Sequence, residues 1–261
     1  MNTQAEATGQ RVVAVVQARM RSSRLPGKVM ADVHGRPVLG RMLDRLARLQ
    51  RVATVAVATT DLPDDDVVAE YCAGRGTECV RGHPTDVLDR FHVAAERLGA
   101  DVIVRLTGDC PVIDPGLVDT CVLAFLEARP PFDLVVNRLP WSRTYPIGLD
   151  TEVFSGAALE VAWREASEPH QREHVVPFLY ENPDRFRMLH LEAEADYGRY
   201  RWTVDTAEDL ELIRRVYAAF GEEDTFTWRD VLALMQREPS LVGLNAAVVH
   251  RTHRDVDPPG S

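Results

Sequence analysis

The sequence lacks several features that would assign it to a specialised class of protein. No apolar run approaches the roughly 18 residues that a membrane-spanning helix needs. The first residues, Met1 to Glu6, contain neither the basic region nor the apolar stretch of a secretion signal. The four cysteines show no C-x-x-C spacing, so neither a zinc ribbon nor a thioredoxin-type pair is indicated. We therefore expect a soluble cytoplasmic protein with reduced thiols and no membrane contact.

Motifs of several enzyme classes are also missing. Gly27-Lys28 is followed by Val29 rather than by Ser or Thr, and Ser22 stands where a P-loop has its first glycine. No G-x-G-x-x-G follows the first expected strand, which argues against a dinucleotide-dependent dehydrogenase. Neither a G-x-S-x-G elbow nor an H-E-x-x-H helix is present. The formal net charge of −10 argues against a nucleic-acid binder, because such proteins need a basic face.

Short β-branched runs alternate with helical patterns along most of the 261 residues. The expected strands are Val12–Val16, Val55–Ala58, Val102–Leu106, Leu134–Val136 and Arg201–Val204. Apolar residues at helical spacing predict helices over 38–49 and 87–98. Two further helices are expected to begin after the N-cap Asp114 and after a capping box formed by Thr206 and Asp209. This alternation predicts an α/β fold with a mostly parallel sheet.

The chain is long enough for one large domain. We expect tails at 1–10 and 245–261, with a single domain over 11–244 between them. The alternation loosens after residue 137, so 137–200 is interpreted as a small insertion over the sheet. His250 and His253 fall in the second tail, where we expect solvated side chains rather than metal ligands.

A basic segment directly follows the first expected strand. Arg19, Arg21, Arg24 and Lys28 fall within ten positions of a chain that is acidic overall. Ligands of parallel sheets bind beyond the carboxyl ends of the strands, where this segment is expected. Guanidinium groups form paired hydrogen bonds with phosphate oxygens, and an ammonium acts there as a point charge. The pattern favours a phosphate site, and a plain basic surface loop is the alternative.

Two aspartates are expected at the ends of strands. Asp109 follows Val102–Leu106, and Asp205 follows Arg201–Val204. Carboxylates at two such ends can converge on one magnesium ion, which binds one or two carboxylates together with phosphates and waters. The alternatives are a turn residue at Asp109 and a helix-start residue at Asp205. The acidic run 64–66 resembles a D-x-D metal motif, but its position after Leu62-Pro63 favours the start of a helix.

Five ordered motifs resemble those of the cytidylyltransferase family, which includes the CMP-sialic acid and CMP-Kdo synthetases. They are the basic segment Gln17–Lys28, Val57–Asp61, Asp86–Phe91, Arg105–Pro115 and Arg201–Asp209. The resemblance covers roughly residues 11–220. It is greatest to the branch of spore coat polysaccharide biosynthesis protein F, because Ala18-Arg19-Met20 replaces the Ala-Arg-Gly-Gly of the sialic-acid branch. It implies a Rossmann-like, three-layer nucleotide-diphospho-sugar transferase fold, and relatives suggest a homodimer.

The resemblance also implies roles for individual residues. Those implied to bind CTP are Gln17, Ala18, Arg19, Arg24, Lys28, Ala58, Thr59, Thr85, Asp86, Arg90 and Asp109. Those expected to act in catalysis are Arg19, Lys28, Asp109 and Asp205, and the two aspartates among them are expected to bind Mg²⁺. Those expected to bind the acceptor, within the insertion, are Arg143, Tyr145, Asp150, Arg172, Glu173 and His174. For His174 the alternative is a helix residue beside the apolar run 175–179.

These features together predict a magnesium-dependent cytidylyltransferase. An acceptor oxygen would attack the α-phosphorus of CTP in line, and pyrophosphate would leave, a reaction that depends on positioning and charge neutralisation. The acceptor is expected to be a sugar, a sugar acid or a related intermediate of polysaccharide biosynthesis or secondary metabolism. Two alternatives stay open: a glycosyltransferase that uses a preformed nucleotide sugar, and a binding protein without catalytic activity.

Overall fold

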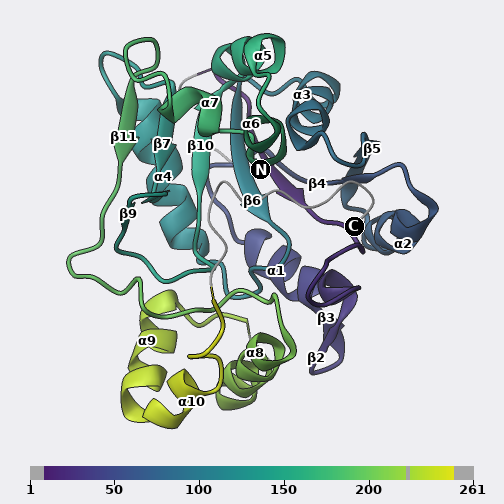
Figure 1. Cartoon of the computed structure of the whole chain (residues 1–261), viewed down its shortest axis with the longest axis vertical. Helices are drawn as coiled ribbons and strands as arrows, with labels where there is room; N and C mark the ends of the chain where they lie inside the picture. The colour runs from purple at the N-terminus through teal and green to yellow at the C-terminus, as the bar shows by residue number, and fades with distance from the viewer. Residues whose placement is uncertain (1–8, 222–223, 250–261) are drawn as a thin grey trace.

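One central sheet organises the computed structural model, which describes residues 9–221 and 224–249. Its strands are β1 (Val12–Gln17), β4 (Thr54–Thr60), β5 (Glu78–Gly82), β6 (Val102–Thr107), β7 (Leu134–Val136), β10 (Glu152–Ser155) and β11 (Met188–His190). They lie in the order β11-β7-β10-β6-β1-β4-β5 (Figure 1). Every neighbouring pair is parallel except the two that involve β10, which runs antiparallel to β6 and β7. The predicted α/β fold with a mostly parallel sheet is therefore confirmed.

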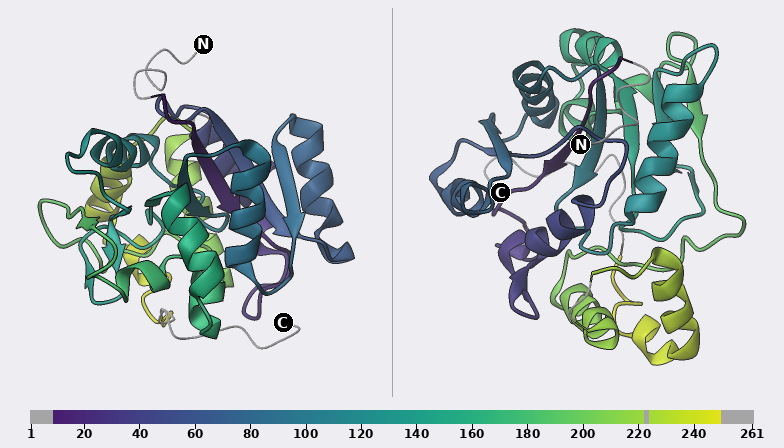
Figure 2. Two further views of the ribbon diagram at one scale, coloured as in Figure 1. Left: turned by 90° about the horizontal axis from the view of Figure 1, so that it is seen from above. Right: turned by 180° about the vertical axis from the view of Figure 1, so that it is seen from behind.

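Helices cover both faces of this sheet, which gives three layers (Figures 1 and 2). The helices are α1 (Val38–Leu46), α2 (Asp66–Arg75), α3 (Val87–Leu98), α4 (Pro115–Glu127), α5 (Gly156–Glu165), α6 (Pro169–His174), α7 (Pro177–Tyr180), α8 (Ala207–Phe220), α9 (Trp228–Arg237) and α10 (Pro239–Gly243). Alternate residues of β1 face opposite layers. Val12, Ala14 and Val16 pack with α1, α2 and α4, whereas Val13 and Val15 pack with α3, α5 and α7.

A third apolar cluster joins the helices α8, α9 and α10 to the end of the sheet. Its largest members are Trp202 and Trp228, both of which are buried. These helices gather at the bottom of Figure 1, below the strands. Two short hairpins complete the described fold, β2 (Asp32–Val33) with β3 (Arg36–Pro37) and β8 (Arg138–Leu139) with β9 (Ser142–Arg143). Single turns of 3₁₀ helix, η2 (Lys28–Met30) and η3 (Pro63–Asp65), follow β1 and β4.

Most of the predicted elements are present near their expected bounds. Four of the five expected strands correspond to β1, β4, β6 and β7. Asp114 caps α4 by accepting a hydrogen bond from the Leu117 N–H, and Thr206 with Asp209 forms the expected capping box of α8. The acidic run 64–66 spans the end of η3 and the start of α2, as its sequence position favours.

The expected strand at Arg201–Val204 is wrong. Only Arg201 forms a β-bridge, to Ile147, and Val204 instead donates its N–H to the Asp109 carbonyl oxygen at 2.8 Å. The apolar side chains of this segment pack among the C-terminal helices rather than between two strands. The β-branched pattern of Arg201–Val204 therefore reflects the burial of this segment and not a strand of the sheet.

The expectation that 137–200 lies over the sheet is wrong for two of its segments, because β10 and β11 belong to the sheet. The antiparallel strand β10 inserts between β6 and β7, where Val153 and Phe154 are fully buried. The second expected tail begins later than residue 245, since Asn245 is only 5% exposed. Residues 1–8 and 250–261, which include His250 and His253, lie outside the described residues. In the described ranges, no helix combines the length and apolar character needed to cross a bilayer.

Arg45 connects three parts of the fold. Its guanidinium is 0% exposed and donates to the carbonyl oxygens of Ile113, Asp224 and Phe226 at 2.6, 3.0 and 2.8 Å. It also lies over the Phe226 ring, 4.2 Å from the ring centroid. Arg45 thus joins α1 to the segment before α4 and to the segment before α9.

We expect Arg45→Met to lower the free energy of unfolding by at least about 3 kcal/mol. The substitution keeps much of the apolar stem but leaves three buried carbonyl oxygens without their donor. Arg215→Met is the matched control, since Arg215 on α8 is exposed and pairs with Glu211 one turn away. The control should change stability by less than about 0.5 kcal/mol. Urea unfolding measures both, and an equal effect of the two variants would contradict the connecting role of Arg45.

Candidate active site

A cleft of about 270 Å³ opens at the carboxyl ends of β1 and β6. These strands are parallel neighbours with Gln17 opposite Thr107. Gly108 donates its N–H to the Gln17 carbonyl oxygen at 2.8 Å, and a Cβ at Gly108 would lie 2.9 Å from the Ala18 Cβ. Only glycine allows this close approach, which brings the segment after β1 beside the segment after β6.

The basic segment that follows β1 is held by backbone contacts. Gly27 has a left-handed conformation (φ 73°) and donates its N–H to the Met20 carbonyl oxygen at 2.7 Å. Met20 in turn donates its N–H to the Asp65 carboxylate at 2.5 Å. Asp65 is buried and also accepts from the Thr60 hydroxyl. Asp65 therefore has two roles: it anchors the basic segment, and it immediately precedes α2.

A compact charge cluster forms the floor of the cleft. The Lys28 Nζ donates to Asp109 Oδ2 and to Asp205 Oδ1, each at 2.6 Å. Asp205 also accepts from Arg24 at 2.9 Å and from Arg201 at 2.6 Å. The two aspartates predicted at different strand ends therefore meet at one point, although Asp205 does not follow a strand.

The protonation states of this cluster follow from its packing. Burial alone raises the pKa of the Asp205 carboxyl, but the three cations around it have the larger combined effect and hold this pKa well below its usual range. Burial lowers the pKa of the Lys28 ammonium, yet Asp109 and Asp205 together raise it above its ordinary value. Lys28 is therefore charged and Asp205 is ionised at neutral pH.

The donor set fits a hard divalent cation. Two carboxylate oxygens, one each from Asp109 and Asp205, lie at hydrogen-bonding distance from a single nitrogen, so they can also converge on one metal ion. The Lys28 ammonium stands in for that cation. No group of three or more acidic, histidine or cysteine side chains in the described ranges forms a metal site from protein ligands alone. Such a pair suits Mg²⁺, which keeps waters and substrate phosphates among its ligands.

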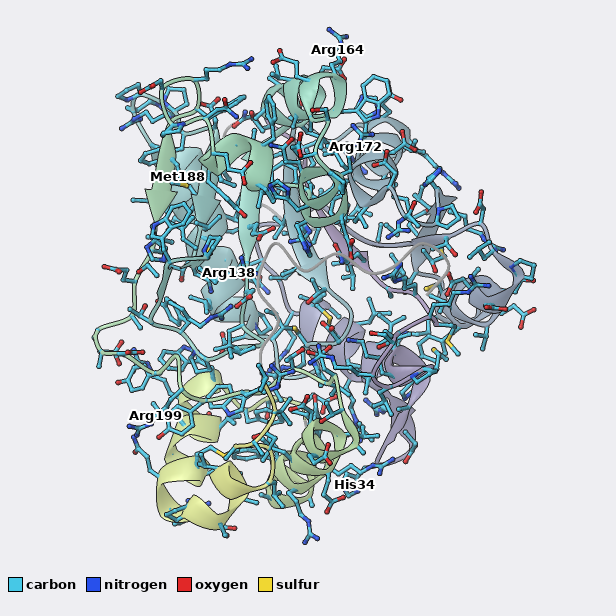
Figure 3. All side chains as sticks on the ribbon, in the orientation of Figure 1. His34, Arg138, Arg164, Arg172, Met188 and Arg199 are labelled. Carbon is cyan, nitrogen blue, oxygen red and sulfur yellow. The ribbon has the colours of Figure 1, made fainter. Side chains whose placement is uncertain are left out.

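Paired charges line the opposite side of the cleft. Arg105 on β6 lies directly across from Glu152 on β10, donates to its carboxylate at 2.6 Å and donates to the Gln17 side chain at 3.0 Å. Beyond them, Asp150 accepts two hydrogen bonds from Arg143, at 2.5 and 2.8 Å, and one from Arg138 at 3.3 Å. Figure 3 shows Arg138 near the middle of the molecule, above the C-terminal helices.

Many of the residues predicted from the sequence line this cleft. They are Gln17, Ala18, Arg19, Arg24, Lys28, Arg90, Asp109, Asp150, Glu173, His174 and Asp205. They come from β1, the basic segment, α3, the segment after β6, the segment before β10, α6 and the segment before α8. The structure therefore brings the expected nucleotide and acceptor groups into one site, and their individual roles stay predictions.

The other predicted residues lie outside the lining of the cleft. Ala58 and Thr59 are buried within β4, and Thr85 is exposed before α3. Tyr145 packs edge-on against Trp228, with ring centroids 5.6 Å apart. Arg143 lies beside the cleft through its pair with Asp150.

Arg172 and Asp86 also lie outside the lining, and they pair with each other. Two guanidinium nitrogens of Arg172 donate to Asp86 Oδ2 at 2.9 and 2.5 Å, and a third donates to the Trp163 carbonyl oxygen. The same aspartate caps α3 by accepting from the Asp89 N–H. Figure 3 shows Arg172 on α6, well above Arg138. This pair joins α6 to the start of α3.

Sequence reasoning missed several residues of the cleft, above all Arg105, Arg138 and Glu152. A charged residue inside an apolar run is the signal that could have identified Arg105 in β6. Glu152 is the first residue of β10 and follows Asp150 and Thr151, so it gives no such signal. Lys28, which was predicted, carries one further signal, because it is the single lysine of the chain. For Arg138 we find no local signal.

Comparison with known proteins gives consistent results. A cytidylyltransferase family model matches residues 13–230. Spore coat polysaccharide biosynthesis protein SpsF of Bacillus subtilis is 32% identical over 239 residues, which are 87% of this chain and 95% of that protein. A cytidylyltransferase structure from Leptospira borgpetersenii is 34% identical with a TM-score of 0.86, over 92% of this chain and 100% of that one. A CMP-Kdo synthetase complexed with CTP is 23% identical with a TM-score of 0.62, over 81% and 100%.

The pair of Arg172 and Asp86 predicts a measurable coupling energy. In a double-mutant cycle with Arg172→Met and Asp86→Asn, we expect the free energies of unfolding to give a coupling of about 1–2 kcal/mol. This coupling energy lies in the lower part of the range that hydrogen bonds to charged groups contribute to stability. Each side chain is about a quarter exposed, so water screens the pair in part. The more exposed pair of Arg185 and Glu165 is the control and should give a clearly smaller coupling. Equal couplings for the two pairs would contradict a structural role for Arg172.

Proposed function

Because the chain belongs to the cytidylyltransferase family, and is thus a nucleotidyltransferase, we propose that it uses CTP and Mg²⁺ to transfer CMP to a small polar acceptor, with release of pyrophosphate. One observation carries this proposal: a basic segment folds over two converging carboxylates, of which Asp109 follows the parallel strand β6 and Asp205 precedes α8. A nucleoside triphosphate needs cations for its phosphates and oxygen ligands for its metal. The cleft offers both within one space.

Arginines from two elements support binding of the triphosphate. Arg19 of the basic segment and Arg90 of α3 both line the cleft. Arg90 is buried, and this burial together with the positive charge of Arg19 lowers its pKa to about 10. An anion between the two guanidinium groups would relieve their repulsion, so phosphate binding there is favourable. Arg24 and Lys28 supply further positive charge from the same segment.

The reaction proposed is an in-line displacement at the α-phosphorus of CTP. Lys28, Arg19 and Arg24 would orient the phosphates and neutralise the charge that moves onto the leaving pyrophosphate. Asp109 and Asp205 would hold magnesium, which when bound adds a second source of positive charge at the phosphates. No covalent intermediate with the protein is required.

The acceptor is proposed to enter from the side of Asp150, Glu173 and His174, which line the cleft. Their carboxylates and imidazole suit a molecule that is rich in hydroxyl groups. His174 would accept the proton of the attacking hydroxyl. We propose a sugar, a sugar acid or a related intermediate, in keeping with the names of SpsF and CMP-Kdo synthetase.

The alternatives from the sequence are less well supported. A glycosyltransferase that takes a preformed nucleotide sugar relies mainly on its metal and does not need several cations over the phosphates. A binding protein without catalytic activity has no need for the carboxylate pair of Asp109 and Asp205. The homodimer, the cytoplasmic location and a place in polysaccharide biosynthesis or secondary metabolism stay predictions.

Nucleotide selectivity tests the proposal directly. We expect CTP with Mg²⁺ to raise the melting temperature more than ATP, GTP or UTP with Mg²⁺, because a ligand that binds only the folded state stabilises it. Pyrophosphate release with a panel of sugars and sugar acids should likewise require CTP. Equal thermal shifts with all four nucleotides would contradict the assignment of CTP.

Asp109→Asn tests the role of the carboxylate pair. The substitution keeps the size of the side chain but removes a proposed metal ligand, so turnover should fall at least about a hundredfold, as for loss of a single electrostatic group in other active sites. Asp66→Asn is the matched control from the acidic run, since Asp66 is exposed and forms an ion pair with Arg81. Its turnover should stay within about twofold of the unmodified chain. Similar losses for both variants would contradict the assignment of the metal site.

A further inference from the structure

The Lys28 ammonium occupies the point where the proposed metal ion would bind. Its nitrogen lies 2.6 Å from one oxygen of Asp109 and 2.6 Å from one oxygen of Asp205. These are short distances for hydrogen bonds between charged groups. The side chain is only 12% exposed, so water screens these contacts weakly. An ammonium and a divalent cation cannot share this point.

The surroundings of Lys28 allow its side chain to move while its backbone stays in place. Gly27 and η2 fix the backbone, because Lys28 donates its N–H to the Leu25 carbonyl oxygen and accepts from the Ala31 N–H. The four-carbon stem carries the charge and has several rotatable bonds. Asp205 keeps Arg24 and Arg201 as partners if the ammonium leaves, so this carboxylate stays oriented.

We propose that Lys28 is a resident counter-ion of the metal site, which exchanges with the divalent cation and then binds the triphosphate. This inference rests on the proposed function for the identity of the metal and of the nucleotide. In the free protein the ammonium neutralises two carboxylates that would otherwise repel each other. On exchange, the Lys28 ammonium becomes available to bind the phosphates, together with Arg19 and Arg24 of the same segment.

The exchange couples the two ligands. The cation alone must displace the ammonium from Asp109 and Asp205, the carboxylates with which it forms ion pairs in the described residues, so it binds weakly. CTP offers that ammonium a new partner and thereby raises the affinity for the cation. Linkage requires the converse as well: the cation raises the affinity for CTP by the same factor.

Mn²⁺ binding to the full chain, measured by calorimetry without nucleotide, tests the exchange. Lys28→Met keeps the length of the side chain and removes the competing charge, so Mn²⁺ should bind about tenfold more tightly than to the unmodified protein. Arg21→Met is the matched control, because it removes one positive charge from the same segment, where Arg21 pairs with Asp64. Its Mn²⁺ affinity should change less than about twofold. Equal or weaker Mn²⁺ binding by folded Lys28→Met, or an equal gain in both variants, would overturn the exchange.

A second measurement uses the unmodified protein and covers the case in which Lys28→Met does not fold. Lys28 is the single lysine, so brief acetylation followed by mass spectrometry of its peptide reports one side chain. Acetylation should increase several-fold with saturating Mn²⁺ and decrease again when CTP is added. Unchanged acetylation with Mn²⁺ bound would overturn the exchange and leave the proposed enzyme intact. Absence of Mn²⁺ binding both with and without CTP would overturn the proposed function as well.

Discussion

The parallel pairing of β1 with β6 is the constraint on which the site depends. Its register places Gln17 beside Thr107, and the absence of a side chain at Gly108 lets the two following segments touch. The cations of the first segment consequently face the carboxylate of Asp109 in the second. A side chain at position 108 would force these segments apart, and the charges would then interact through water rather than directly.

Several charges in and beside the cleft are matched in pairs. Arg105 is matched by Glu152, Arg143 by Asp150, and Lys28 by two aspartates. Such pairing avoids the cost of leaving buried ions without partners. It also means that a ligand enters by replacing existing contacts, so binding and rearrangement of the pairs occur together.

The sequence predicts those parts of the fold whose pattern is determined locally. Apolar runs identify β1 and β6, and side chains at the caps identify the starts of α4 and α8. The position of β10 is not determined by local sequence, because its insertion between β6 and β7 depends on how strands that are distant in sequence pair with one another. Likewise Arg201–Val204 is buried like a strand but pairs through one bridge only, and no local pattern distinguishes these two cases. The site follows the same division: the basic segment is evident from its composition, whereas the partners of Arg172 become clear only in three dimensions.

The contacts of Asn245 extend the active site beyond the last helix. Its amide donates to the Arg201 carbonyl oxygen at 3.0 Å and to the Asp209 carboxylate at 2.7 Å, and Asp209 is bound by the Arg201 side chain that also holds Asp205. A chain shortened at residue 244, where its composition suggests that a tail begins, would lose this amide. Truncation at that point would therefore disturb, from 40 positions away in sequence, the electrostatic support of Asp205, the carboxylate proposed to bind the metal. An affinity tag or a chain end belongs after residue 245.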